Sequence, residues 1–354
     1  MLYQTENQHG GDVYGGGITL DFSANTNPLG TPPGVLEAVR RGLPQLHRYP
    51  DPYCRQLVQA IAAHEQVPAS YVLCGNGAAD LIYAYCAALR PRTAVEPAPT
   101  FAEYGLGLAQ VGCRVAPYFL HQAENFDLDE GFLPFLEEKK PEVVFLCTPN
   151  NPTGRLLPLP LLEWILQGCA AWGARVFLDE CFLDLTEDGV SAKALLTAHP
   201  ELLILKAFTK SYGMAGIRLG YCLCADSTLL HRMASASQPW NVSSLAQSAG
   251  VAALAERDFL QRTLALVRTE RRWLTDNLMA LGFWVCPSQA NYLLFRGPRG
   301  LREGLLRRGI AIRSCGNYNG LDDGWYRIAV RPHEENEVLI TAIRQFCEEK
   351  SLWQ

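Results

Sequence analysis

The sequence predicts an α/β protein built around a mostly parallel sheet, and three patterns lead to that expectation. Short, continuously apolar runs alternate with longer segments of helical periodicity through most of the chain. Apolar runs of this kind are typical of strands that helices cover on both faces. Polar and glycine-rich turns follow several of these runs, where an α/β sheet binds its ligands. After about Pro239 the elements become shorter, which favours a smaller α+β unit at the C-terminal end.

The expected strands of the large part are short apolar runs bounded by turn residues. In chain order they are Tyr71–Cys74, Thr93–Glu96, Arg114–Tyr118, Val143–Cys147, Arg175–Leu178, Leu202–Phe208 and Leu219–Cys224. The segments between them carry apolar residues at helical spacing, so one face of each helix can cover the sheet. The expected helices are Gly34–Gly42, Tyr53–His64, Ala78–Leu89, Phe101–Val111 and Pro160–Trp172.

The C-terminal part begins with a helical region, Ser244–Leu281, that is long enough to connect two domains. The elements expected after it are Phe283–Cys286, Asn291–Phe295, Leu301–Arg308, Ala311–Arg313, Trp325–Val330 and Glu335–Lys350. We therefore expect an N-terminal arm over residues 1–30, a large domain over residues 31–245 and a small C-terminal domain over residues 246–354.

The composition excludes several classes of function. The chain has 31 Lys and Arg against 36 Asp and Glu, a formal net charge of -5, so a nucleic-acid or anionic-membrane surface is not expected. No apolar stretch approaches the roughly 20 residues that span a bilayer, and residues 1–17 lack the apolar core of a secretion signal. The 12 cysteines lack metal-ligand spacing, so we expect a cytoplasmic protein without a metal site.

The most informative segment surrounds Lys210, which follows an apolar strand within a run of small and glycine residues. A lysine that enters a buried cleft can lose its proton and attack a carbonyl group, forming a Schiff base. Thr209 and Arg218 could hold an anionic group beside it. Lys206, within the strand, is an alternative buried lysine, and a solvated loop lysine is the plain structural alternative. We favour Lys210 because the arginine and the glycines cluster around it.

Two other strand ends carry polar side chains. Asp179 ends an apolar strand, where a carboxylate can pair with a protonated ring nitrogen of a ligand, although helix capping is equally ordinary for an aspartate. Asn150 and Asn151 lie between prolines in a turn after another strand, and a side-chain amide there can donate to a ligand oxygen. An ordinary turn is the alternative for either half of that segment.

A glycine-rich turn, Gly75-Asn76-Gly77-Ala78, joins a strand to a helix. Glycines allow backbone N–H groups to approach a phosphate, and the N-terminus of a helix favours negative charge. The pattern is neither GxGxxG nor a P-loop, so it does not support a dinucleotide or nucleoside-triphosphate site.

Taken together in chain order, these segments resemble the class I and II aminotransferase group of fold-type I pyridoxal 5′-phosphate (PLP) enzymes over nearly the whole chain. The resemblance implies that the large domain binds PLP, that Lys210 forms its Schiff base and that Asp179 pairs with its ring nitrogen. It also implies that Tyr104 stacks on the ring and that Asn151 reaches the ring's O3′. The residues implied around the cofactor phosphate are Gly75, Asn76, Gly77, Ala78, Thr209 and Arg218.

One further match concerns the quaternary structure. Tyr49, in Arg48-Tyr49-Pro50, matches a tyrosine that reaches the cofactor phosphate of a neighbouring subunit, which implies a homodimer.

Other segments resemble one branch of the group, the histidinol-phosphate aminotransferase branch. They are Arg48-Tyr49-Pro50 and Asn25-Thr26-Asn27-Pro28. His9-Gly10-Gly11, Phe101-Ala102-Glu103-Tyr104-Gly105 and Phe182, where the aminotransferases usually have tyrosine, resemble its amino-acid phosphate decarboxylases more narrowly. The implied reaction is decarboxylation of L-threonine O-3-phosphate to (R)-1-amino-2-propanol O-phosphate, for the nucleotide loop of cobalamin.

The same resemblance implies the substrate contacts. Arg313 and Arg327 would lie near the substrate carboxylate, His9 and Asn25 near its phosphate, and Asn151 would also contact the substrate. Structural ion pairs are the alternative for the arginines, and a mobile chain end is the alternative for His9.

Two other functions are compatible with these residues, and a third requires more chain than is present. An aminotransferase acting on histidinol phosphate would share every cofactor residue. A decarboxylase of L-serine O-phosphate differs by one methyl group of substrate, which a pocket discriminates by about 1–3 kcal/mol. A PLP-binding regulator would require an additional DNA-binding module, for which 354 residues leave no room.

Overall fold

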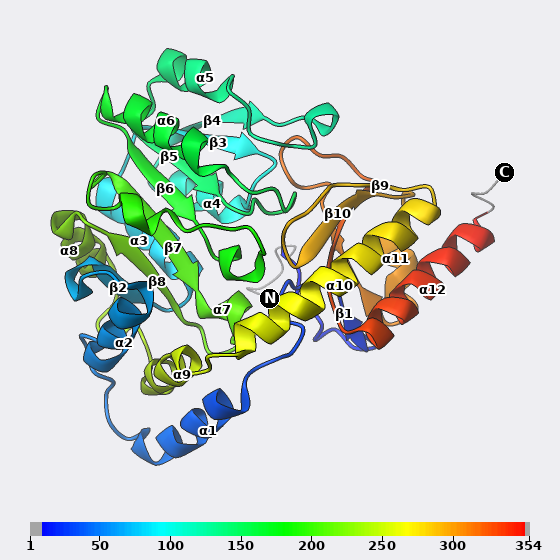
Figure 1. Cartoon of the computed structure of the whole chain (residues 1–354), viewed down its shortest axis with the longest axis horizontal. Helices are drawn as coiled ribbons and strands as arrows, with labels where there is room; N and C mark the ends of the chain where they lie inside the picture. The colour runs from blue at the N-terminus through cyan, green and yellow to red at the C-terminus, as the bar shows by residue number, and fades with distance from the viewer. Residues whose placement is uncertain (1–8, 351–354) are drawn as a thin grey trace.

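The computed structural model describes residues 9–350 and has a large and a small part (Figure 1). The large part is centred on a seven-stranded sheet in the order β2-β8-β7-β6-β5-β3-β4. Its strands are β2 (Val72–Gly75), β3 (Thr93–Ala98), β4 (Arg114–Phe119), β5 (Val143–Cys147), β6 (Arg175–Asp179), β7 (Leu202–Ala207) and β8 (Gly220–Cys224). Only β8 is antiparallel to its neighbours, which confirms a mostly parallel sheet.

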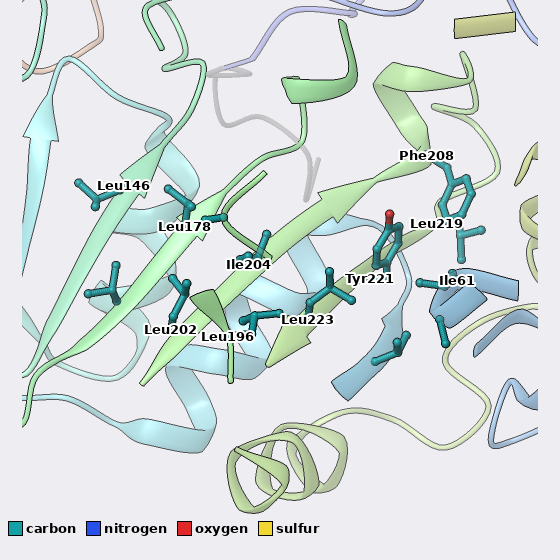
Figure 2. Close-up of a cluster of buried hydrophobic side chains, with 14 of the residues drawn as sticks. Ile61, Leu146, Leu178, Leu196, Leu202, Ile204, Phe208, Leu219, Tyr221 and Leu223 are labelled. Carbon is teal, nitrogen blue, oxygen red and sulfur yellow. The ribbon is translucent and has the colours of Figure 1, made fainter. Parts of the chain in front are cut away.

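Helices cover both faces of this sheet because alternate residues of each central strand point to opposite sides. In β5, Val144 and Leu146 belong to one buried cluster, and Val143 and Phe145 belong to another. Figure 2 shows part of the first cluster, which α2 and α6 cover. The helices of the large part are α1 (Pro33–Gly42), α2 (Arg55–Glu65), α3 (Ala78–Leu89), α4 (Ala102–Gln110), α5 (Phe132–Lys139), α6 (Leu159–Ala170), α7 (Phe208–Ser211), α8 (Ser227–Ala236) and α9 (Ser244–Leu254).

The helical region expected over Ser244–Leu281 is two helices rather than one. α9 ends at Leu254, and α10 (Phe259–Ala280) begins after a short break. The direction changes because α9 packs on α1 and α2, whereas α10 runs to the small part, where Leu274 and Leu278 are buried (Figure 1). The boundary expected between residues 245 and 246 falls inside α9, and since α9 packs on helices of the large part, we propose the break between α9 and α10 as the boundary instead.

The small part has a four-stranded antiparallel sheet in the order β12-β13-β10-β9, with helices packed against it. Its elements are β9 (Trp284–Val285), β10 (Tyr292–Arg296), α11 (Leu301–Leu306), β12 (Arg313–Ser314), β13 (Trp325–Ala329) and α12 (His333–Glu349). A separate parallel pair joins β1 (Leu20–Asp21) to β11 (Ile310–Ala311), and Phe22 is fully buried in the core of the small part. The N-terminal segment is therefore attached to the small part. No helix within residues 9–350 is long and apolar enough to cross a membrane.

Candidate active site

A cavity of about 420 Å³ lies where the large part, the small part and the N-terminal segment meet. Cys147, Asp179 and Ala207, the last residues of β5, β6 and β7, line its floor. Most of the residues singled out in the sequence line it: His9, Asn25, Ala78, Tyr104, Asn151, Asp179, Thr209, Lys210, Arg218, Arg313 and Arg327. Gly75, Asn76 and Gly77 are not lining residues but directly precede Ala78, which is one, whereas Tyr49 lies elsewhere. The volume is within the range of small-molecule sites, roughly 300–1,000 Å³.

Lys210 lies in α7, one short turn beyond the end of β7, with its Nζ 5.4 Å from the centre of the Phe182 ring. Burial lowers the pKa of Lys210 to about 8, and the nearby positive charges of Arg327 and Arg218 act in the same direction. A substantial fraction of this amine is therefore neutral near physiological pH, as a nucleophile or proton carrier requires.

Lys206, the alternative lysine, faces away from the cavity. Its Nζ lies 2.9 Å from Glu65 Oε1 and 3.2 Å from Asp184 Oδ1. Burial alone would lower the pKa of Lys206, but carboxylates, Asp184 first, outweigh it and raise the pKa well above its usual value. The side chain stays charged, so only Lys210 has the properties of a reactive amine.

Asp179 is buried at the end of β6 and has two hydrogen-bond donors. The Tyr104 hydroxyl donates to Oδ2 at 2.6 Å, and the backbone N–H of Cys181 donates to Oδ1 at 2.8 Å. Burial raises the pKa of Asp179, while these hydrogen bonds act against the rise. A cationic ligand atom beside Asp179 would further favour its ionised form. The Tyr104 ring itself stacks on Phe145, with 5.3 Å between the centroids.

Asn150 and Asn151 have different surroundings. Asn150 holds the turn together, since its amide donates to Pro99 O at 2.9 Å and its Oδ1 accepts from the Thr100 hydroxyl. Asn151 lines the cavity, and its Oδ1 accepts a hydrogen bond of 2.5 Å from Arg327 Nη1. Asn150 therefore stabilises the turn itself, whereas Asn151 faces the cavity.

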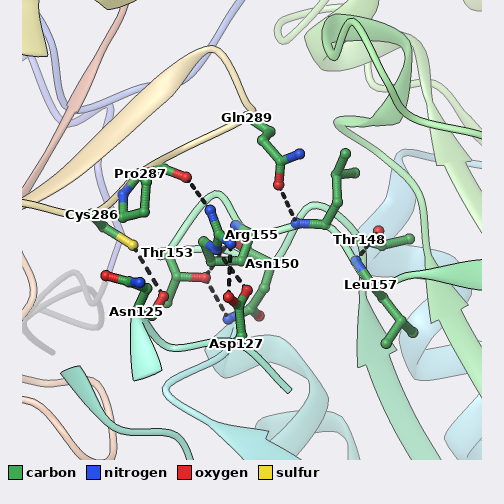
Figure 3. A network of polar contacts seen from close by, with 11 residues as sticks. Asn125, Asp127, Thr148, Asn150, Thr153, Arg155, Leu157, Cys286, Pro287 and Gln289 are labelled. Atoms are coloured by element: carbon green, nitrogen blue, oxygen red, sulfur yellow. Dashed lines mark hydrogen bonds and ion pairs between the residues drawn. The ribbon is translucent and has the colours of Figure 1, made fainter. Parts of the chain in front are cut away.

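A polar network attaches this turn to the small part (Figure 3). Arg155 donates to both carboxylate oxygens of Asp127 at 2.7 Å and to Pro287 O at 2.5 Å. Gln289 accepts from the backbone N–H of Leu156 at 3.2 Å. Because the Asp127–Arg155 pair is bidentate, it fixes the geometry of the turn that carries Asn151.

In the glycine-rich turn, the Arg218 guanidinium lies very close to the backbone of Gly77. Gly77 has a φ of +89°, and a Cβ there would lie 2.8 Å from Arg218 Nη2. The turn is held by Asp80, whose Oδ2 accepts from the backbone N–H of Asn76 at 3.0 Å. The Arg218 guanidinium therefore lies against the start of α3 without an intervening side chain, as a phosphate site requires.

Some buried polar atoms of the cavity wall have no hydrogen-bond partner among residues 9–350. Asn25 is 1% exposed, and neither atom of its amide has a hydrogen-bond partner among the described residues. Arg327 donates through Nη2 to Ser23 O at 2.8 Å, yet its buried Nε has no partner within residues 9–350. Because an unsatisfied buried polar group is costly, these atoms indicate a polar ligand.

The other two candidate substrate residues also lie in the cavity wall. Arg313 donates to Asn317 Oδ1 at 2.8 Å, and its guanidinium lies 5.3 Å from the centre of the Tyr318 ring. His9 Nε2 lies 2.7 Å from Glu103 Oε1, so the N-terminal segment does extend to the cavity.

Tyr49 does not line the cavity of its own chain. Its side chain is 78% exposed and stacks on Trp240 with 4.4 Å between the centroids. Its role at a neighbouring subunit's cofactor stays a prediction.

Sequence reasoning assigned no role to Ser23, Glu103 or Tyr318, although all three line the cavity. Each lies within five residues of a predicted site residue in the sequence, and this proximity is the one sign that could have identified it. Each also has a contact with a residue far away in the chain: Glu103 with His9, Ser23 with Arg327 and Tyr318 with Asn151.

The chain is similar over most of its length to proteins of known class. The family model for aminotransferase class I and II matches residues 18–343. Threonine-phosphate decarboxylase from Salmonella typhimurium is 41% identical over 329 residues, which cover 92% of this chain and 90% of that protein.

Two solved structures have nearly the same fold. Histidinol-phosphate aminotransferase from Clostridium acetobutylicum superposes with a TM-score of 0.87 at 27% identity, covering 93% of this chain and 99% of that one. L-threonine-O-3-phosphate decarboxylase from Porphyromonas gingivalis gives a TM-score of 0.83 at 26% identity, with the same coverage. The two classes are thus about equally similar in backbone. Together with the cavity at the strand ends, these matches establish that the chain belongs to the class I and II aminotransferase family.

Proposed function

We propose that this protein is a PLP-dependent decarboxylase that converts L-threonine O-3-phosphate to (R)-1-amino-2-propanol O-phosphate, a precursor of the cobalamin nucleotide loop. The observation that carries the proposal is the 41% identity to a threonine-phosphate decarboxylase over 92% of the chain. The site agrees with it. Asn25 and Arg327 line the same cavity as Arg218, and their buried polar atoms that lack a partner among the described residues could bind a polar substrate.

The cavity fits PLP, which is the cofactor of this family. Asp179 would hold the ring nitrogen in its protonated form, and Asn151 would contact the ring oxygen. The phosphate would be held at the start of α3 by backbone N–H groups, Thr209 and Arg218. When bound, PLP supplies an electron sink that accepts the electron pair released when a bond at Cα breaks.

The remaining residues would orient the substrate. The Arg327 guanidinium, which Asn151 and Ser23 hold in place, is a planar donor set suited to a carboxylate. Arg313 would act in the same region, and His9 with Asn25 would bind the substrate phosphate. Holding the substrate at both ends fixes which Cα bond faces the electron sink, and this selects loss of carbon dioxide over loss of the α-proton.

The reaction consumes one proton, because Cα gains a hydrogen when carbon dioxide leaves. We propose that Lys210 delivers it, since its lowered pKa of about 8 allows both protonation states near neutrality. The aromatic neighbour of Lys210 is Phe182, which has no hydroxyl to exchange protons.

The test is a product assay on the purified protein with PLP. With L-threonine O-3-phosphate we expect carbon dioxide and 1-amino-2-propanol O-phosphate in equal amounts. Formation of glutamate from 2-oxoglutarate with histidinol phosphate, without release of carbon dioxide from the threonine phosphate, would show an aminotransferase instead. L-serine O-phosphate should react with a kcat/KM roughly 10- to 200-fold lower, because it lacks only one methyl group.

We further propose that the protein is a cytoplasmic homodimer. The twelve cysteines, all within residues 9–350, form no disulfide there, which agrees with a reducing compartment. The exposed position of Tyr49 supports a contact with a second copy.

A further inference from the structure

The wall of the active-site cavity contains a carboxylate, that of Glu103. Glu103, in the first turn of α4, lines the site with a side chain that is 12% exposed. Under the proposed function this cavity accepts two molecules that carry phosphate, and a carboxylate near a phosphate opposes its binding.

Glu103 has a fixed orientation. Its Oε1 lies 2.7 Å from His9 Nε2, and its Oε2 accepts a hydrogen bond of 2.7 Å from the Tyr83 hydroxyl in α3. The hydrogen bond from His9 lowers the pKa of Glu103 most, and the bond from Tyr83 adds to this against the effect of burial. Glu103 is therefore an ionised acceptor with a partner on each oxygen.

His9 is attached at its backbone as well. The next residue, Gly10, lies so close to Ser23 that a Cβ on it would be 2.2 Å from Ser23 O. The Gly11 N–H donates to Ser23 Oγ at 2.8 Å. The imidazole, 5.8 Å from the Phe101 ring, extends from this anchored backbone across to Glu103.

The position of His9 matters because it separates two cavities. A second cavity of about 460 Å³ lies beside the active-site cavity. His9, Gly10, Ser23 and Arg313 line both of them and so form the dividing wall. A displaced His9 would open the substrate side of the site to this neighbouring space.

We propose that Glu103 is a positioning residue for the substrate phosphate: it holds the His9 imidazole in the cavity wall, and Tyr83 fixes Glu103 for this task. The inference rests on the proposed function in one respect, namely that the substrate carries a phosphate. Glu103 acts through His9, and its own charge opposes the ligand.

These two effects of Glu103 have opposite signs, so they can be separated. If Glu103 serves to hold His9, Glu103→Ala raises the KM for L-threonine O-3-phosphate by about tenfold and changes kcat much less. In the His9→Ala background, Glu103→Ala no longer raises KM and lowers it slightly, because only the repulsion remains to be removed. Tyr83→Phe raises KM by a smaller factor, and Glu103→Gln, which keeps an acceptor, lies between wild type and Glu103→Ala.

Three comparisons separate positioning from a general structural role. The Ki of L-threonine, which lacks the phosphate, should change less than twofold in Glu103→Ala. The matched control is Glu303→Ala, which removes a carboxylate from the second cavity that is paired with Arg302 rather than with His9. It should leave the KM within about twofold. The absorbance spectrum of bound PLP in each variant shows whether the site has folded.

The inference is overturned if Glu103→Ala lowers the KM in the wild-type background, or if it raises the KM equally with and without His9. Failure of the proposed function would look different, since the wild-type protein itself would release no carbon dioxide. Histidinol phosphate also carries a phosphate, so the same KM comparison with that substrate would then decide the role of Glu103.

Discussion

Lys206 and Lys210 lie four positions apart, yet their surroundings give them opposite properties. Lys206 has two carboxylate partners in the protein interior, whereas Lys210 shares its cavity with the cationic side chains of Arg327 and Arg218. The same residue type thus has a raised pKa in one place and a pKa of about 8 in the other. A nucleophile needs the second environment.

This difference predicts how each lysine reacts in the cofactor-free protein. Only a neutral amine is acetylated, so labelling of Lys210 by acetic anhydride should rise as the pH increases through about 8 and then level off. Lys206 should stay unlabelled throughout this range. Mass spectrometry of the peptides at each pH, with the anhydride concentration corrected for its hydrolysis, measures both rates. A Lys210 rate that still rises without a plateau at pH 10 would contradict the lowered pKa.

Sequence patterns predicted site residues best where the chain fixes their position locally. Asp179 and Lys210 follow buried strands, and strand ends meet at one edge of the sheet, so their meeting was predictable. The bond from the Tyr104 hydroxyl to Asp179 spans 75 residues and depends on how α4 packs on the sheet. The same holds for the contact between His9 and Glu103. Such contacts depend on tertiary packing, which residue spacing does not encode.

At the scale of elements, a buried ionic network supports the turn that carries Lys210. Ser211 Oγ donates to Asp184 Oδ2 at 2.9 Å, and Asp184 pairs with Lys206. Lys206 pairs in turn with Glu65 of α2, which also accepts from the Tyr221 hydroxyl at 2.5 Å. The network links α7, β7, β8 and α2, so the active-site turn is fixed to the body of the large part.

Removal of the central cation should destabilise the protein strongly. Lys206→Met would remove the buried cation that Glu65 and Asp184 share, at a cost of about 3–5 kcal/mol, and among the described residues Glu65 would keep only its pair with Lys193. Burial alone would raise the pKa of Glu65, but Lys206, Tyr221 and Lys193 together lower it to about 2. Stability from this lowered pKa is present above about pH 4.5 and is lost as the pH falls toward 2.

The difference in Tm between wild type and Lys206→Met should therefore be largest above pH 5 and should shrink as the pH falls. Calorimetry over pH 3–8 measures it. Lys193→Met is the matched control, because Lys193 also pairs with Glu65, at 2.9 Å, but is 32% exposed. A control variant as unstable as Lys206→Met, or a pH-independent difference, would contradict this account.

The elements themselves were largely predictable, but their arrangement was less so. The strand expected over Ala311–Arg313 contributes to two sheets, since β11 pairs with β1 and β12 pairs with β13. Similarly, β8 lies antiparallel between β2 and β7. Apolar runs show which segments are buried on both faces. They do not show the partner or direction of a strand, which depend on connections elsewhere in the chain.

At the scale of the whole molecule, one exposed segment carries several large apolar side chains. The segment between α1 and α2 exposes four large side chains, and one of them, Tyr49, stacks on the exposed Trp240; the other three are Leu43, Leu46 and Tyr53. Exposed apolar patches of this kind mark interaction sites. A second copy of the chain is the partner that would also explain why Tyr49 lies outside the cavity of its own subunit.

The homodimer proposal predicts active-site complementation between inactive chains. Neither Lys210→Ala nor Tyr49→Ala should be fully active alone, and the wild type should have about twice the 39.2 kDa mass of one chain in solution. In a mixed dimer, the site with an intact Lys210 would receive its tyrosine from the Lys210→Ala chain, so dissociation and reassociation of the two variants should restore activity at that site. A chain that carries both substitutions, mixed with wild type, is the control, because the site with an intact Lys210 then lacks the tyrosine. If Tyr49 acted within its own chain, the first mixture would gain no activity, whereas a monomeric protein would show neither the doubled mass nor any effect of mixing.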